Sequence, residues 1–235
     1  RNKARACDAV GIKNTTVRLP ADTPESELLD RIAELNADDS VDGILVQLPL
    51  PKQISEPRVI EAIALEKDVD GFHPLNTAAL WQKRPNSSCV VPCTPMGIIH
   101  LLEEAGCQIA GKNAVVIGRS QIVGLPMAKL LLDRNATVTI CHSRTADLAN
   151  FTRQADILVV AIGKAKFVTG DMVKEGAVVM DVGMDRDEEG KLCGDVDFDS
   201  VAAKASVITP VPGGVGPMTI CCLMENTIKC FLAKM

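Results

Sequence analysis

The stretch AVVIGRSQIVGLP, residues 114–126, decides the fold. An apolar run ends at Gly118, a polar turn follows, and Gly124 opens an amphipathic segment, which is the pattern of strand, tight turn and helix. Such a turn directs free N–H groups and the positive end of the helix toward an anion, typically a dinucleotide pyrophosphate. The spelling departs from G-x-G-x-x-G, because Ser120 replaces the second glycine and the last glycine falls one residue late. On these residues alone, a plain strand-to-helix connection explains the turn about equally well.

The composition favours a two-domain α/β protein. The 235 residues suffice for two modest α/β domains or one large one. Apolar residues make up 47% and aromatic residues 3%, so the core is aliphatic, as suits buried parallel strands. With a net charge of −5 and no basic patch, we expect no nucleic-acid partner. No apolar run reaches bilayer length and no signal peptide precedes the first helix, so we expect no membrane partner.

The nine cysteines are odd in number and scattered, which argues against a disulfide framework. They indicate a reducing compartment, and we expect the cytoplasm, with an organellar matrix as the alternative. Cys89 and Cys93 are four residues apart, but no second pair completes a zinc-type site, so we expect no metal. The chain opens at Arg1, without Met and in mid-helical pattern, so we expect further sequence before it.

The periodicity predicts two domains. Residues 1–93 form a smaller domain on which a final helix, 218–235, packs back, and residues 94–217 form a Rossmann-type domain of alternating parallel strands and helices. Helices are predicted at 2–10, 24–35, 56–64 and 94–106, with Thr23 and Thr94 as the N-cap residues of the second and fourth. Strands are predicted at 15–19, 41–48, 112–117, 136–141, 156–161, 177–181 and 206–209. Residues 77–88 are predicted to be irregular.

The residues after the predicted strand 136–141 favour NADP. An acidic side chain there would bind the ribose 2′-hydroxyl of NAD, but this sequence has Ser143 and Arg144 instead. Arg119, in the first turn, adds a second cation. A 2′-phosphate carries about two negative charges and suits arginine. A solvated polar turn is the alternative interpretation.

Other candidate residues are ambiguous when taken singly. Lys3 has the features of an ordinary surface lysine. Gln47 ends an apolar strand, where its amide either bonds the backbone or faces a ligand. Asp70 precedes Gly71, as many turn aspartates do. The loop PVPGGVGP, 210–217, suits the close approach of a flat ligand or simply connects two domains.

Taken together and in order, seven segments resemble one family. They are ILVQLPLP (44–51), KDVDGFHP (67–74), PCTPMGI (92–98), GRSQIVGLPMA (118–128), DVGM (181–184), GDVDF (194–198) and ITPVPGGVGPMT (208–219). Across its whole length the chain resembles the bifunctional methylenetetrahydrofolate dehydrogenases/methenyltetrahydrofolate cyclohydrolases. The resemblance implies homodimers in which two α/β domains flank a folate cleft. It also implies NADP-dependent oxidation of 5,10-methylenetetrahydrofolate and hydrolysis of the methenyl product to 10-formyltetrahydrofolate.

The resemblance also implies roles for individual residues. The catalytic lysine of a Tyr-x-x-x-Lys motif matches Lys3, and its tyrosine falls before Arg1; the active-site glutamine matches Gln47 and the pterin-binding aspartate Asp70. Folate contacts match Val46, Gln47, Leu48, Asp70, Pro212, Gly213, Gly214, Val215 and Gly216, and cofactor contacts match Gly118, Arg119, Ser120, Ser143 and Met184, to which the charge argument adds Arg144.

Two other functions compete with this interpretation. If the N-terminal segment of the family is absent, the chain is an NADP-binding fragment with impaired or no turnover. A different lysine-dependent Rossmann dehydrogenase, of the shikimate type, is the third possibility, and the GRSQIVGLP turn and the PVPGGVGPMT loop argue against it.

Overall fold

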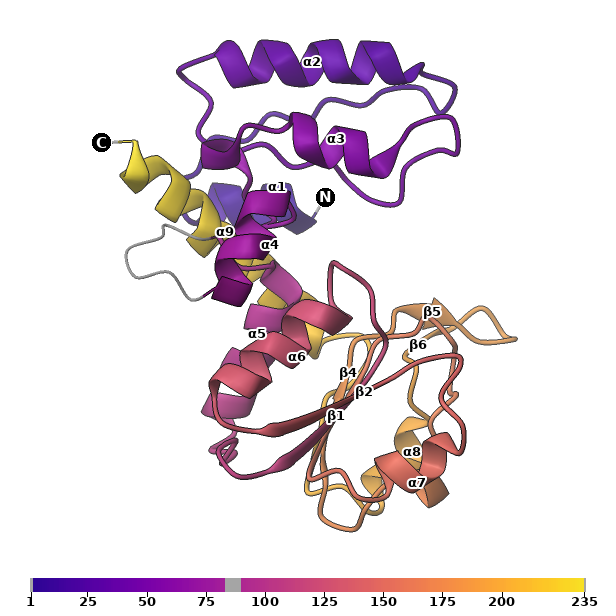
Figure 1. Cartoon of the computed structure of the whole chain (residues 1–235). Coiled ribbons are helices and arrows are strands. Elements are labelled where there is room, and N and C mark those ends of the chain that lie inside the picture. The colour runs from indigo at the N-terminus through magenta and orange to yellow at the C-terminus, as the bar shows by residue number, and fades with distance from the viewer. Residues whose placement is uncertain (1, 83–89, 235) are drawn as a thin grey trace. The chain divides into compact units, whose positions relative to one another are not determined.

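The computed structural model describes residues 2–82 and 90–234, and its chain forms two compact units (Figure 1). The first unit comprises Arg1–Cys93 and Ile220–Met235, and the second comprises Thr94–Thr219. Along the described residues, no helix has both the length and the apolar character needed to cross a lipid bilayer.

A five-stranded parallel sheet forms the centre of the second unit. Its strands, in spatial order, are β2 (Thr137–Cys141), β1 (Asn113–Ile117), β3 (Ile157–Val160), β4 (Val178–Asp181) and β7 (Val207–Ile208). The five predicted strands of this region are thus confirmed. The apolar side chains of the three inner strands, β1, β3 and β4, are almost all buried, because helices cover the sheet on both faces, whereas those of the edge strands β2 and β7 are mostly half-buried.

Helices and one hairpin complete the second unit. Helix α6 (Gly124–Asp133) packs on β1 and β2, whereas α7 (Leu148–Thr152) and α8 (Phe198–Ala202) lie on the other side of the sheet (Figure 1). The 3-10 turn η2 (Gly170–Met172) lies between α7 and α8. Strands β5 (Asp185–Arg186) and β6 (Leu192–Cys193) form an antiparallel hairpin that the sequence analysis did not predict.

The first unit is mainly helical. It contains α1 (Asn2–Ala9), α2 (Glu25–Ala37), α3 (Glu56–Ala62), the 3-10 turn η1 (Leu65–Lys67), α4 (Pro74–Gln82) and most of α9 (Val215–Ala233). Helices α2 and α3 lie side by side (Figure 1). Ile32, Ile44 and Val59 are at the centre of its apolar core.

Two predicted strands in the first unit, 15–19 and 41–48, are wrong. Across the described residues these segments form no named strand, and the second makes only one parallel bridge, Ile44 to Asp68. Residues 15–19 are all exposed and most of 41–48 are half-buried, and a strand also needs a hydrogen-bonded neighbour along its length.

Several predicted helix limits also need correction. Pro24, not Thr23, is the N-cap residue of α2. Helix α4 occupies part of the segment predicted to be irregular, of which residues 83–88 lie outside the described ones. Helix α5 (Cys93–Glu104) begins one residue early, so Thr94 lies inside it. Helix α9 begins at Val215 and takes in the end of the predicted loop 210–217.

Candidate active site

Lys3 and Gln47 are brought together although they are 44 positions apart. Lys3 projects from α1, and its Nζ donates a hydrogen bond to Gln47 Oε1 over 3.0 Å. The other end of the amide is fixed, because Gln47 Nε2 donates to the carbonyl of Leu48 at 2.8 Å. The lysine is half-buried and the glutamine exposed. Gln47 therefore bonds a backbone group, which is one of the two alternatives left open by the sequence, and it also accepts a hydrogen bond from the lysine amine.

Asp68 organises the loop that carries Asp70. Its carboxylate is 2% exposed and accepts hydrogen bonds from the N–H groups of Gly71, at 3.0 Å, and His73, at 2.8 Å. Asn76 Nδ2 donates to the same carboxylate at 2.8 Å. This carboxylate is therefore occupied by the turn itself, which removes it from any ligand set.

Asp70 is the carboxylate of this loop that is placed to meet a ligand. Its side chain is half-buried and lines a small cavity with Val46, Leu48 and Phe72. Loss of solvation raises the pKa of Asp70 to about 6, and the positive charge of Lys3 opposes that rise. Lys3, Gln47 and Asp70 thus form one polar group beside an apolar surface in the first unit.

In the second unit, the turn after β1 depends on two glycines. A Cβ on Gly118, whose φ is +124°, would lie 2.3 Å from the Ala161 carbonyl oxygen. A Cβ on Gly124 would lie 2.3 Å from the Gly118 carbonyl oxygen. The first glycine therefore lets the turn contact the end of β3, and the last lets α6 start against the strand, which are glycine functions of a dinucleotide-binding turn.

Ser120 has a function that its place in the motif does not reveal. Its Oγ accepts hydrogen bonds from the N–H groups of Val123, at 3.2 Å, and Gly124, at 3.3 Å. Its carbonyl accepts from Leu125 N at 3.0 Å. The hydroxyl thus satisfies donors at the start of α6 that the sequence analysis expects to be free.

The turn after β2 holds Ser143 and Arg144 in solvent beside the first turn. Ile117 of β1 pairs with Cys141 of β2, and Gly118 N donates to the Cys141 carbonyl, so both turns leave the sheet side by side. His142 N donates to Thr145 Oγ1, and Arg144 N donates to His142 Nδ1, which leaves both predicted side chains exposed. Arg119 is exposed as well. Two arginines at the carboxyl ends of adjacent strands suit the phosphates of NADP.

Two buried aspartates hold the neighbouring loops at the same edge of the sheet. Asp181, at the end of β4, accepts hydrogen bonds from the N–H groups of Gly183, Asp195 and Val196 at 2.9–3.0 Å. Asp195 is fully buried and accepts from Ile162 N and Lys164 N at 2.7 and 2.6 Å. Desolvation raises the pKa of Asp181 to about 6. These carboxylates fix the segments around Ala161 and Gly183, which adjoin the predicted cofactor residues.

The remaining predicted residues lie near the start of α9. Pro212 and Gly213 are exposed, Gly214 and Val215 are buried, and Gly216 is partly buried. A Cβ on Gly216 would lie 3.6 Å from Met184 Cε, so Met184, which is 66% exposed, contacts this turn.

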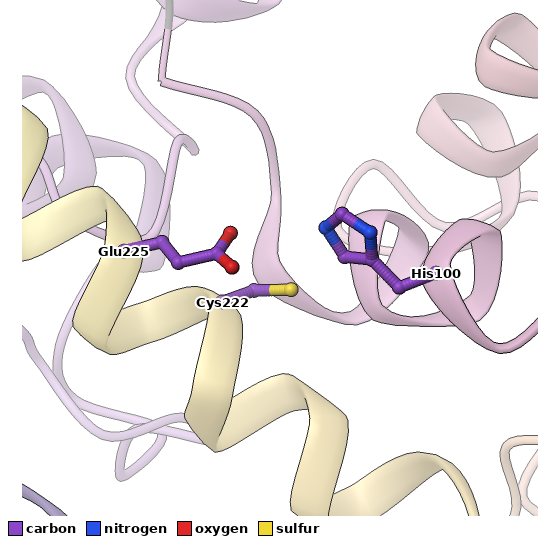
Figure 2. A group of neighbouring side chains, drawn as sticks. All are labelled: His100, Cys222 and Glu225. Atoms are coloured by element: carbon purple, nitrogen blue, oxygen red, sulfur yellow. The ribbon is translucent and has the colours of Figure 1, made fainter. Parts of the chain in front are cut away.

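One group of potential metal-ligand side chains draws its members from both units. Figure 2 shows His100 projecting from α5, and Cys222 and Glu225 projecting from α9. His100 belongs to the second unit and the other two to the first, so this group supports no metal assignment.

Sequence reasoning missed the functions of Asp68, Asp181 and Asp195. A signal existed for Asp181, since a carboxylate directly after a buried apolar strand needs hydrogen-bond donors. The hydrogen bonds of Asp195 join segments more than 30 positions apart, and no local pattern encodes them.

Two family models match the chain. The model of the tetrahydrofolate dehydrogenase/cyclohydrolase catalytic domain matches residues 1–70. The model of the NAD(P)-binding domain of tetrahydrofolate dehydrogenase/cyclohydrolase matches residues 92–235.

Individual proteins show the same relationship. The bifunctional protein FolD of Streptococcus thermophilus is 59% identical over 235 residues, covering 100% of this chain and 82% of that protein. The crystal structure of the bifunctional enzyme FolD, methylenetetrahydrofolate dehydrogenase/cyclohydrolase, from Campylobacter jejuni superposes with a TM-score of 0.95 at 50% identity, covering 100% of this chain and 82% of that one. The Trypanosoma brucei enzyme, crystallised with NADP cofactor and an inhibitor, gives a TM-score of 0.93 at 41% identity, covering 98% of this chain and 80% of that one.

Proposed function

The chain belongs to the tetrahydrofolate dehydrogenase/cyclohydrolase family, and we propose that it performs both reactions of that family with Lys3, Gln47 and Asp70. It is an NADP-dependent methylenetetrahydrofolate dehydrogenase and methenyltetrahydrofolate cyclohydrolase. The match of residues 1–70 to the catalytic-domain model favours this function over that of a fragment that only binds NADP. The observation that carries the residue assignment is the hydrogen bond between Lys3 and Gln47, with Asp70 close enough for the lysine charge to affect its pKa.

The oxidation needs positioning more than acid–base chemistry. The methylene carbon loses a hydride, and the resulting cation is shared by two nitrogens, so no proton has to be removed. Gly118, Arg119, Ser120, Ser143, Arg144 and Met184 would hold the NADP, which supplies the hydride acceptor when bound. The exposed arginines at the ends of β1 and β2 support the preference for NADP.

The hydrolysis needs a base. Water adds to the methenyl carbon and gives up a proton, and one carbon–nitrogen bond then breaks as its nitrogen takes a proton. Lys3 is the group that moves these protons. Gln47 accepts a hydrogen bond from the lysine without adding charge, and its own amide is held by the Leu48 carbonyl.

Asp70 binds the pterin in this proposal. Its carboxylate accepts hydrogen bonds from amino and ring N–H groups of the folate, as ionised carboxylates do. Val46, Gln47 and Leu48 in the first unit, and residues 212–216 in the second, are the remaining predicted folate contacts. A homodimeric state and a cytoplasmic location remain part of the proposal, the latter supported by the free cysteines among the described residues.

A direct assay tests the proposal. Spectrophotometry with methylenetetrahydrofolate and NADP should show NADPH formation. A fall in the absorbance of the methenyl product should then show its hydrolysis. If the protein produced no NADPH, the assigned activity would be wrong. If it produced NADPH but did not hydrolyse the methenyl compound, the assignment of Lys3 and Gln47 to hydrolysis would be wrong.

A further inference from the structure

Asn226 is a buried polar residue on α9 that joins two separate segments of the first unit. Its side chain is 3% exposed. Nδ2 donates hydrogen bonds to the Val69 carbonyl at 3.0 Å and the Val91 carbonyl at 2.9 Å, so both amide hydrogens are used. The Cys93 thiol donates to the same Val69 carbonyl at 3.5 Å. The peptide group joining Val69 to Asp70 is therefore held by α9 and by the start of α5.

The segments that Asn226 joins also touch through their backbones. Gly71 has φ +74°, and a Cβ there would lie 2.7 Å from the Val90 carbonyl oxygen and 2.8 Å from Pro92 N. On the other side of Asp70, the N–H of Gly71 is held by Asp68. Asp70 thus lies between two anchored peptide groups, one bound by Asn226 and the other by Asp68.

We propose that Asn226 is a positioning residue for folate binding, which sets the direction of the Asp70 carboxylate through the Val69 carbonyl. This inference rests on the proposed function of Asp70. Asn226 does not touch substrate. Without its amide, the Val69 and Val91 carbonyls lose the donor that they share. On that side of Asp70 only the weak Cys93 thiol donor then holds the Val69 carbonyl, so the backbone can shift more easily, while Asp68 still holds the other side. A shift of the carboxylate weakens hydrogen bonds to the pterin and leaves the cofactor residues unchanged.

The variant Asn226→Ser tests this positioning function. Loss of two hydrogen bonds should raise the tetrahydrofolate Kd about tenfold, by calorimetry, and leave the NADP Kd unchanged. The matched control is Thr227→Val, which removes a hydroxyl that, among the described residues, donates within α9 to the Leu223 carbonyl, and it should leave both constants unchanged. The NADP Kd and the midpoint of thermal unfolding report whether each variant is folded.

A double-mutant cycle with Asp70→Asn separates positioning from general stabilisation. Since Asn226 acts through Asp70, Asn226→Ser should have little further effect on the tetrahydrofolate Kd in the Asp70→Asn background. An undiminished tenfold effect there, or no effect of Asn226→Ser in the wild type, would overturn the inference and leave the proposed function standing. If Asp70→Asn itself leaves the tetrahydrofolate Kd unchanged, the proposed function of Asp70 fails, and the inference fails with it.

Discussion

The two units position their predicted functional residues by different means. In the second unit, Gly118 and Ser143 follow the ends of neighbouring strands, so the hydrogen-bond ladder of the sheet sets their spacing. In the first unit, Lys3 lies on a helix, Gln47 on a segment without regular pairing and Asp70 in a loop. Individual side-chain bonds, rather than a ladder, hold these three residues in place.

Buried carboxylates anchor loops in both units, but the loops differ in how much other hydrogen bonding supports them. Asp181 and Asp195 reinforce loops that already leave a regular sheet. Asp68 anchors a loop whose adjoining backbone has one isolated bridge, at Ile44. Single substitutions in the first unit should therefore disturb its site more selectively than comparable changes in the second.

The largest expected effect separates the two reactions. Lys3→Met should lower cyclohydrolase kcat by about 100- to 10,000-fold, the range of a lost acid–base group, and spare more of the dehydrogenase activity. Both rates are measured on the same preparation, with Lys13→Met as a control at an exposed lysine. Equal losses in the two reactions would contradict a function confined to proton transfer.

The next effect concerns the cofactor residues of the second unit. Arg144→Glu should weaken NADP binding by roughly 30-fold relative to NAD, because a cation facing the 2′-phosphate is replaced by an anion. The ratio of kcat/KM for the two cofactors measures this directly. An unchanged ratio would remove Arg144 from the phosphate site.

Exchanging one carboxylate in each unit tests the comparison itself. Asp68→Asn should raise the folate KM roughly tenfold with little change in the NADP KM. The reason is that the substitution replaces a carboxylate oxygen that accepts hydrogen bonds from the loop carrying Asp70. Asp195→Asn should raise the NADP KM with little change in the folate KM, because Asp195 holds Ile162, which follows the Ala161 carbonyl that lies against Gly118 of the predicted cofactor turn. Parallel changes in both constants for either variant would show that the units are not independent.

The smallest effect is one of pH. The pKa of Asp70 is raised to about 6, so falling pH protonates it and replaces a hydrogen-bond acceptor with a donor. Between pH 8 and pH 5.5 the kcat/KM for the folate should fall about fourfold for this reason. The Asp70→Asn variant should lack this inflection; if it keeps the inflection, another group is responsible.

The sequence predicts the second unit better than the first, because regular strand pairing leaves a local pattern and individual side-chain bonds do not. The apolar runs of β1, β3 and β4 gave correct strands because burial on both faces of a sheet leaves a strong local pattern. Segments 15–19 and 41–48 were predicted as strands too, but they lack partner strands along the described chain, and pairing is a property of distant segments. The resemblance assigned Lys3 and Gln47 to one active site, but no spacing in the sequence predicts the hydrogen bond between them. The bonds of Asp195 and Asn226 had no local signal at all.

The hydroxyl of Ser120 has a consequence for how tightly an anion can be held at the start of α6. Because Val123 N and Gly124 N already donate to it, an anion arriving at the start of α6 must take these donors from an existing partner. Binding there is an exchange of hydrogen bonds, so its net gain is smaller than two new bonds would give. A cosubstrate is spent in each catalytic cycle and has to be replaced. A turn whose donors return to Ser120 when an anion departs therefore holds that anion less tightly than free donors would.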